Sequence, residues 1–164
     1  MIVIYKSNTG YTRQYAKLLA KALDIPAYSA DSIPEVHKGG DAIFLGWLMA
    51  GSIVGYKKVA KYCNVKAAIG VGMSPPAEEL VPGFRAKMHI PESVAVFYLQ
   101  GGFDISKLKG PFKLIMKIKV KDIAARLTSK PSLTPQEQAT LDMTAVGASC
   151  VCEENLAEIL AWAK

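Results

Sequence analysis

The chain has 164 residues, of which 51% are hydrophobic and 21% are charged, and this composition argues against a disordered chain and suits one domain, 1–164, with a sizeable core. The net charge of +6 favours anionic partners. Three cysteines without a C-x-x-C pair and two widely separated histidines argue against a disulfide framework and against a metal site.

The chain begins with an apolar run, Ile2–Tyr5, which we interpret as a strand that leads into a loop and a helix ending near Leu23. The N–H groups of the first turn of such a helix and its macrodipole attract an anion. Serine and threonine hydroxyls donate hydrogen bonds to the anion, and glycine allows the backbone of the loop to take a positive φ. The sequence therefore predicts a phosphate-binding loop, although an ordinary turn with Thr12 as N-cap also fits. We call this segment the phosphate loop; its residues are Ser7, Asn8, Thr9, Gly10, Tyr11 and Thr12.

This segment resembles the phosphate loop of the flavodoxins, which reads [ST]-x-T-G-x-T directly after the first strand and binds the phosphate of FMN. Ser7, Thr9, Gly10 and Thr12 fill its four defined positions. The resemblance implies FMN as the cofactor and electron transfer as the function.

Four more runs of apolar, β-branched or aromatic residues follow, and most are continuous, as in strands buried on both faces. Stretches with helical character lie between them at 56–63 and at 77–89, the second interrupted by Pro82-Gly83. Such alternation predicts an α/β fold, with a five-stranded parallel sheet between two layers of helices. We expect the strand order 2-1-3-4-5, which is that of flavodoxin. The four runs are 25–28, 42–47, 66–72 and 94–99.

In that order, the ligand also touches the loops after the third and fourth strands. A glycine precedes each loop, Gly46 and Gly72, either for close approach to the ligand or for packing alone. Many flavodoxins place an aromatic residue in each loop, whereas Ala50 stands near the usual position here. We interpret Trp47 as a core residue. Tyr56 or Phe103 could then cover the flavin, or one face of the flavin is covered by aliphatic side chains or left open. The loop residues are Leu48, Met49, Ala50, Gly51, Met73 and Ser74.

The segment 103–152 is too long for a plain connection, and we expect a basic helical insertion there. The stretches 98–104, 107–110 and 112–117 resemble the region after the fifth strand in flavodoxin-type, menaquinone-dependent protoporphyrinogen oxidases. That resemblance implies an alternative function, an FMN-dependent oxidoreductase acting on a quinone or a small planar substrate. A redox partner protein is the expected partner of a simple electron carrier.

A helix with Pro111 at its first position would align Lys113, Lys117 and Lys121 in one stripe. Either this stripe is a solvated face of a docked helix, or it contacts an anionic membrane or an acidic partner. No signal for nucleic-acid binding accompanies the lysines. The apolar residues expected on the other side of the helix are Phe112, Ile115, Met116, Ile123 and Leu127.

The chain ends with two more expected helices, one starting at the capping box of Thr134 and Glu137 and reaching about Met143, and one with apolar residues from Leu156 onwards. No apolar run approaches the length of a membrane span, so we expect a cytoplasmic protein with peripheral membrane contact as an option. A third function remains open, a flavodoxin-like binding module without redox activity.

Overall fold

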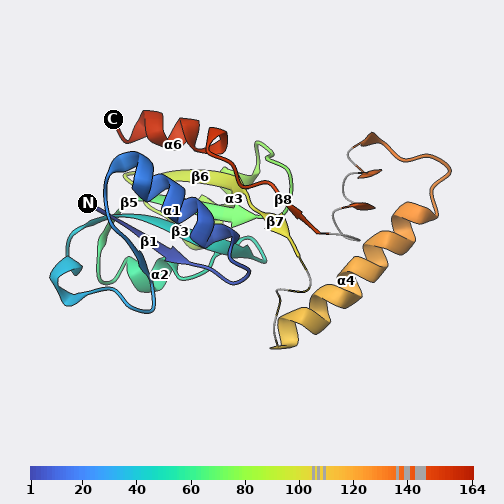
Figure 1. Ribbon diagram of the computed structural model, residues 1–164, viewed down its shortest axis with the longest axis horizontal. Coiled ribbons are helices and arrows are strands. Elements are labelled where there is room, and N and C mark those ends of the chain that lie inside the picture. Colours follow the sequence, from blue (N-terminus) through green and yellow to red (C-terminus); the bar gives the residue numbers. More distant parts are fainter. Residues whose placement is uncertain (105, 107, 109, 136, 139–140, 143–146) are drawn as a thin grey trace. The chain divides into compact units, whose positions relative to one another are not determined.

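The computed structural model describes the chain except for residues 105, 107, 109, 136, 139–140 and 143–146. It divides into two compact units, which we call the sheet unit (Met1–Gly101 with Cys150–Lys164) and the inserted unit (Gly102–Ser149). Figure 1 shows the elements of both units. The inserted unit occupies most of the segment 103–152, and the assignment of the whole chain to one domain stays a prediction.

A mainly parallel sheet forms the centre of the sheet unit, so the predicted α/β class is confirmed. Its strands lie in the order β2-β1-β3-β5-β6, and β4 pairs antiparallel with the end of β3. All five expected runs contribute residues to strands; four of the runs have buried residues on both faces, whereas the residues of β2 are only half-buried. The strands are β1 (Ile2–Lys6), β2 (Ala27–Ser29), β3 (Asp41–Met49), β4 (Ser52–Ile53), β5 (Asn64–Gly72) and β6 (Ala95–Gln100).

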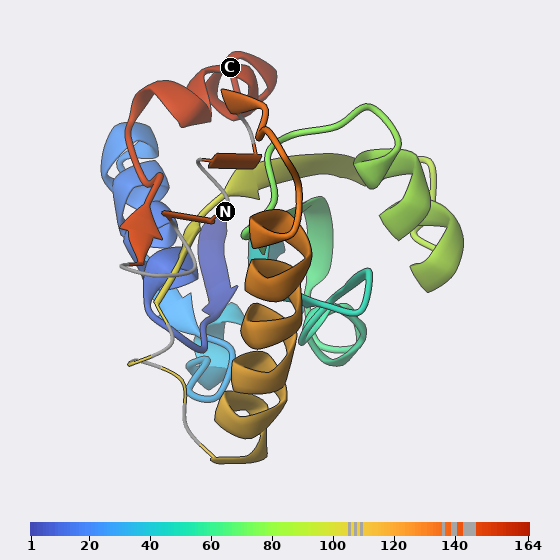
Figure 2. The same ribbon diagram turned by 90° about the vertical axis from the view of Figure 1, so that its right-hand side faces the viewer.

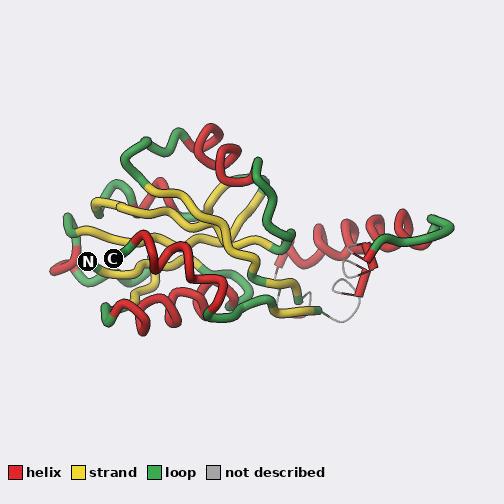
Figure 3. The backbone as a smooth tube through the Cα atoms, turned by 90° about the horizontal axis from the view of Figure 1, so that it is seen from above, coloured by secondary structure: helices red, strands yellow, loops and turns green. Residues whose placement is uncertain are grey.

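Alternate residues of the strands feed two separate buried clusters, one on each face of the sheet. Ile4 and Phe44 pack with α2 (Tyr56–Val59) and α3 (Leu80–Met88). Val3 and Ile43 pack on the other face with α1 (Tyr11–Leu23), the short helix η3 (Glu154–Leu156) and α6 (Ala157–Trp162). Helices therefore cover both faces, as the view along the sheet shows (Figure 3).

Two helices of the sheet unit differ from their predicted extent. α2 ends at Val59, and the amides of Tyr62 and Cys63 both bond to its carbonyl in a turn that leads into β5. α3 runs through Pro82-Gly83 without interruption. Pro82 lies in the first turn of this helix, where its missing N–H would have no helical acceptor. A short helix, η1 (Glu35–His37), precedes β3.

In the inserted unit, a short antiparallel pair, β7 (Gly102–Phe103) and β8 (Ala148–Ser149), is accompanied by one long helix, α4 (Gly110–Thr128). Figure 2 shows α4 as a single unbroken helix. The capping box is confirmed, since Thr134 Oγ1 accepts from the Glu137 amide at 3.2 Å and Glu137 Oε2 accepts from the Thr134 amide at 3.0 Å. The expected end of that helix, Met143, lies outside the described residues.

The distribution of side chains around α4 corrects one prediction. Lys117 and Lys121 are exposed, and Lys113 is half-buried. Met116, Ile123 and Leu127 are half-buried, but Ile115 is 51% exposed and does not join them. The side chain of Phe112 is outside the described part of the structure. The helix thus carries apolar residues on two faces rather than one.

None of the helices in the described part of the chain is long and apolar enough to cross a membrane.

Candidate functional site

The phosphate loop places Ser7 at the start of α1. Gly10 is the N-cap of this helix, with φ 98°, so the interpretation of Thr12 as N-cap is wrong. Ser7 Oγ accepts hydrogen bonds from the backbone amides of Gly10 at 3.2 Å and Arg13 at 3.3 Å. Two amide hydrogens therefore converge on one oxygen atom, and an amide nest of this kind also accommodates an oxygen of an anion.

The surroundings of this loop suit a negative charge. α1 has 13 residues and carries no acidic residue in its first turn, so the positive end of its dipole is not neutralised there. Asn8 is exposed, Ser7, Thr9 and Gly10 are half-buried, and Thr12 is only 2% exposed. Thr12 therefore forms part of the wall of the loop, and Ser7 and Thr9 offer the more accessible hydroxyls.

The register of the sheet brings strand ends together beside this loop. Lys6, the last residue of β1, is paired with Gly46 of β3, and Gly72, the last residue of β5, is paired with Gln100 of β6. The phosphate loop and the turns after β3 and β5 therefore follow strand ends at one edge of the sheet. This edge of a parallel sheet is the usual location of ligand sites.

After β3 the chain forms a tight hairpin instead of the open loop that we expected. Leu48 and Met49 are still part of β3, and Met49 pairs with Ser52 of β4. Ala50 and Gly51 are the two turn residues, with φ 47° and 70°. Two positive φ values in a two-residue connection are typical of the type I′ hairpin turn, which matches the twist of the strands.

Gly46 and Gly72 serve packing within the protein. A Cβ atom at Gly46 would lie 2.6 Å from Ile53 Cγ2, and one at Gly72 would lie 2.8 Å from the Tyr98 hydroxyl oxygen. Their missing side chains therefore make room for β4 and for Tyr98. Of the two explanations for these glycines, packing is the one that the structure bears out.

Met73 and Ser74 begin the turn after β5, and their carbonyl groups are held from β6. Gln100 Nε2 donates to Met73 O at 3.3 Å, and the Tyr98 hydroxyl donates to Ser74 O. Burial raises the pKa of Tyr98 to about 12, so this hydroxyl keeps its proton at physiological pH. The turn is thereby fixed to its neighbouring strand.

Gly101, just after β6, lies close to Tyr11 and Gly72, and the sequence did not predict this proximity. Its amide donates to Gly72 O at 2.7 Å, and a Cβ atom on it would lie 3.1 Å from Tyr11 Cβ. The end of β6 therefore lies against the start of α1. The only signal in the sequence is a glycine pair that follows Gln100 at the end of an apolar run.

The aromatic residues considered for covering a flavin are largely inside the protein. Tyr56 is 5% exposed and packs against Phe44 with ring centroids 6.4 Å apart; burial raises its pKa. Phe103 is 6% exposed. Trp47 is half-buried at the end of β3 and belongs to neither core cluster, so its assignment as a core residue is wrong.

A charged pair next to the phosphate loop was also not anticipated. Lys6 Nζ lies 2.7 Å from Asp31 Oδ2. The hydrogen bond from Lys6 lowers the pKa of the Asp31 carboxyl group. Because Lys6 is neutralised in this way, attraction of an anion to the loop depends on backbone amides and hydroxyls.

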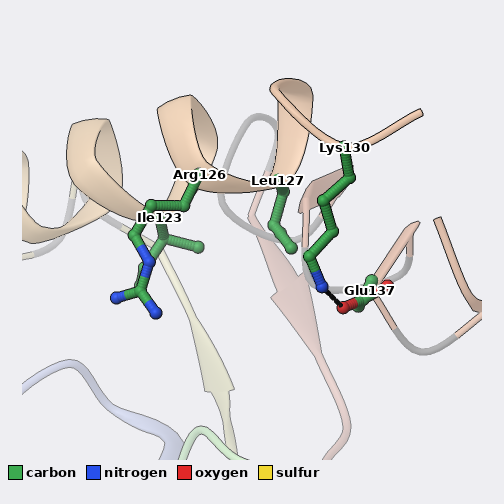
Figure 4. Close-up of a pocket in the computed structure, with 5 residues that line it drawn as sticks. All are labelled: Ile123, Arg126, Leu127, Lys130 and Glu137. Atoms are coloured by element: carbon green, nitrogen blue, oxygen red, sulfur yellow. Dashed lines mark hydrogen bonds and ion pairs between the residues drawn. The ribbon is translucent and has the colours of Figure 1, made fainter. Parts of the chain in front are cut away.

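A separate pocket of about 340 Å³ lies within the inserted unit. Figure 4 shows Ile123 and Leu127 of α4 along it and Lys130 reaching toward Glu137. Arg126 completes the residues that line it. This pocket shows which face of α4 is turned toward the rest of its own unit.

Comparison with family models, curated proteins and solved structures found no match to this chain. Among the described residues, no group of three or more histidine, cysteine, aspartate or glutamate side chains is arranged to hold a metal ion.

Proposed function

We propose that the protein binds FMN in a flavodoxin-like arrangement and transfers electrons. The observation that carries the proposal is the convergence of the Gly10 and Arg13 amides on Ser7 Oγ at the start of α1. This nest follows β1, next to which the strand order reverses: the chain passes from β1 to β2 on one side and then returns to β3 on the other. Nucleotide cofactors of open α/β sheets bind at such a reversal.

In this proposal, the hydroxyl groups of Ser7, Thr9 and Thr12 and the backbone amides at the start of α1, among them those of Gly10 and Arg13, would hold the phosphate. The residues that would flank the isoalloxazine are Leu48–Gly51 on one side and Met73 and Ser74 on the other. FMN supplies the one- and two-electron chemistry, and the chain positions it and limits its contact with water. Leu48 and Met73 provide aliphatic rather than aromatic cover.

The decisive experiment is a titration of the purified protein with FMN and, separately, with riboflavin. We expect binding of FMN in about a one-to-one ratio and weaker binding of riboflavin, because a hydrogen bond to a charged phosphate contributes about 1.5–3 kcal/mol. Changes in flavin absorbance and quenching of flavin fluorescence measure the binding of FMN and of riboflavin. Absence of FMN binding would remove the redox proposals and favour the binding module.

A serine substitution tests the phosphate loop directly. Ser7→Ala should weaken FMN binding roughly ten- to a hundredfold and leave riboflavin binding almost unchanged. Ser29→Ala is the matched control, because Ser29 Oγ also accepts a hydrogen bond from a backbone amide, that of Asp31 at 3.3 Å, but Ser29 is the last residue of β2 and not part of the phosphate loop. Equal losses for FMN and riboflavin would indicate a disturbed fold.

A second candidate function is an FMN-dependent oxidoreductase that passes electrons to a quinone or another small planar substrate. It is suggested by the resemblance of the stretches 98–104, 107–110 and 112–117 to the flavodoxin-type protoporphyrinogen oxidases, and the exposed apolar residues of α4, Leu114, Ile115 and Ile118, are compatible with an apolar partner. The two functions differ in how the reduced flavin is reoxidised. Rapid reoxidation by a quinone supports the oxidoreductase, and reoxidation only by a carrier protein supports the shuttle.

A further inference from the structure

The positive charge of this protein is concentrated in one segment. Residues 105–121 contain six lysines and no acidic residue. Removing these six from the 20 basic residues leaves 14, which equals the number of acidic residues, so the rest of the chain has no net charge. The lysines are Lys107, Lys109, Lys113, Lys117, Lys119 and Lys121.

The same segment contains the first half of α4, where large apolar side chains are exposed. Leu114 and Ile118 are each 64% exposed, and Ile115 is 51% exposed. Leu114 and Ile118 are four residues apart and therefore adjacent on one side of the helix. We call these three residues the apolar ridge. Lys117 and Lys121 are both exposed and lie beside the ridge on the helix surface, three residues after Leu114 and Ile118 respectively.

Leu114 and Ile118 of the ridge face away from the pocket of the inserted unit. Ile118 and Leu127 are nine residues apart, which is about two and a half turns, so they point in opposite directions. Leu127 and Ile123 line the pocket with Lys130 and Glu137. The helix thus already has one apolar face turned to its own unit, and the ridge is a second, separate face.

We propose that this half of α4 lies flat on an anionic lipid membrane, with the apolar ridge inserted into the headgroup and acyl boundary and with Lys117 and Lys121 bound to lipid phosphates. A helix with apolar residues flanked by lysines has the composition of an interfacial helix. Each lysine at such a surface adds attraction, and the ridge adds apolar burial.

The apolar ridge favours a lipid membrane over a nucleic acid as the anionic partner of α4. A nucleic acid would engage the lysines, but it offers no apolar surface of sufficient extent for leucine and isoleucine side chains along its phosphate backbone. A lipid surface satisfies both groups at once, with phosphates at the depth of the lysines and acyl chains below them. This inference does not rest on FMN binding, because α4 carries it alone.

The test is flotation of the full-length protein with vesicles of phosphatidylcholine alone or mixed with phosphatidylglycerol. We expect binding to the anionic vesicles only, weakened by salt. Leu114→Gln with Ile118→Gln should lower the partition coefficient at least tenfold while leaving the charge unchanged. Val36→Gln is the control, since Val36 is 82% exposed in the sheet unit.

Lysine substitutions test the charge. Lys117→Gln with Lys121→Gln should lower partitioning about 30-fold. Lys57→Gln with Lys61→Gln removes the same charge from exposed positions of the sheet unit and should leave binding nearly unchanged. Equal effects of the two pairs would mean diffuse adsorption and would overturn the proposal.

Two other results would also overturn it. One is the absence of binding to anionic vesicles at low salt, with circular dichroism showing an intact fold. The other is a dimer in light scattering that Leu114→Gln with Ile118→Gln dissociates, together with no vesicle binding, because a second copy of the chain would then cover the ridge. FMN titration of the same samples is independent of both results.

Discussion

At the scale of single residues, Gly10 has a backbone conformation that other residues rarely adopt. Its φ is 98°, and the nearest atom to an added Cβ would be Gln14 Nε2 at 4.0 Å, so the obstacle to a side chain is conformational rather than steric. Gly10→Ala should therefore lower the free energy of unfolding by about 1–2 kcal/mol. Urea denaturation measures this change.

Gly83 is the matched control for that substitution. It lies inside α3, and an added Cβ would meet nothing within 4 Å. Gly83→Ala should raise the free energy of unfolding by up to about 1 kcal/mol, because alanine favours a helix. The same sign for both substitutions would contradict the conformation assigned to Gly10.

Tyr15 is the residue that ties the C-terminal part of the chain to the end of β6. Its hydroxyl lies 2.7 Å from Gln100 O and 2.9 Å from Cys150 O, and Asn155 Nδ2 donates to it at 2.7 Å. Burial raises the pKa of this side chain, which keeps the hydroxyl protonated. The chain thus returns to the sheet unit through a fixed polar contact.

Tyr15→Phe should lower the free energy of unfolding by about 1–3 kcal/mol, because it removes the part-buried hydrogen bonds of the hydroxyl with Gln100 O, Cys150 O and Asn155 Nδ2. Tyr62→Phe, at a position 47% exposed, should have little effect. A double-mutant cycle with Asn155→Ala should show coupling between the two side chains. Strict additivity would mean that the Tyr15 and Asn155 bond contributes nothing to stability.

At the scale of elements, the capping box around Glu137 makes part of the inserted unit sensitive to acid. Hydrogen bonds, the first from Lys130, lower the pKa of Glu137 from 4.5 to about 2. Because the folded pKa is depressed, the stabilisation is present above pH 4.5 and is lost as the pH falls toward 2. Glu137→Gln should remove this dependence.

The measurement compares unfolding of the inserted unit in the wild type and in Glu137→Gln at neutral pH and near the folded pKa. We expect the difference in stability to shrink as Glu137 becomes protonated, and an NMR titration of its carboxyl group gives the pKa directly. Lys130→Gln should move that pKa upward. A difference that is constant with pH would contradict the role assigned to Glu137.

Elements that depend on local pattern could be predicted from the sequence. The apolar runs of β1, β3, β5 and β6 are long, and burial on both faces makes them continuous, so their class was clear. β4 was missed because it has only two residues and exists through its pairing with the end of β3. In the same way, Ser7 was expected as a donor, whereas its role as an acceptor depends on the fold of the loop.

At the scale of the whole chain, the insertion leaves and re-enters the sheet unit at neighbouring residues. The Cys150 amide donates to Gly101 O at 2.8 Å, and both residues belong to the sheet unit. Both buried clusters consist of residues outside 102–149. The insertion at 103–152 could be expected from its length, but its exact bounds could not, because the short pairing of β7 with β8 that closes it gives almost no periodic signal.

This geometry predicts that residues 102–149 are dispensable for the fold of the sheet unit. Replacing them with a short glycine and serine linker should preserve cooperative unfolding, because Gly101 and Cys150 are already adjacent and the loop-closure cost falls with loop length. The shortened protein should bind FMN as the full chain does and should lose binding to anionic vesicles, since it lacks α4. Calorimetry, FMN titration and vesicle flotation measure the three properties on one sample. A shortened protein that folds but still binds anionic vesicles would place the membrane contact outside α4, and one that folds but loses FMN would show that the inserted unit contributes to the flavin site.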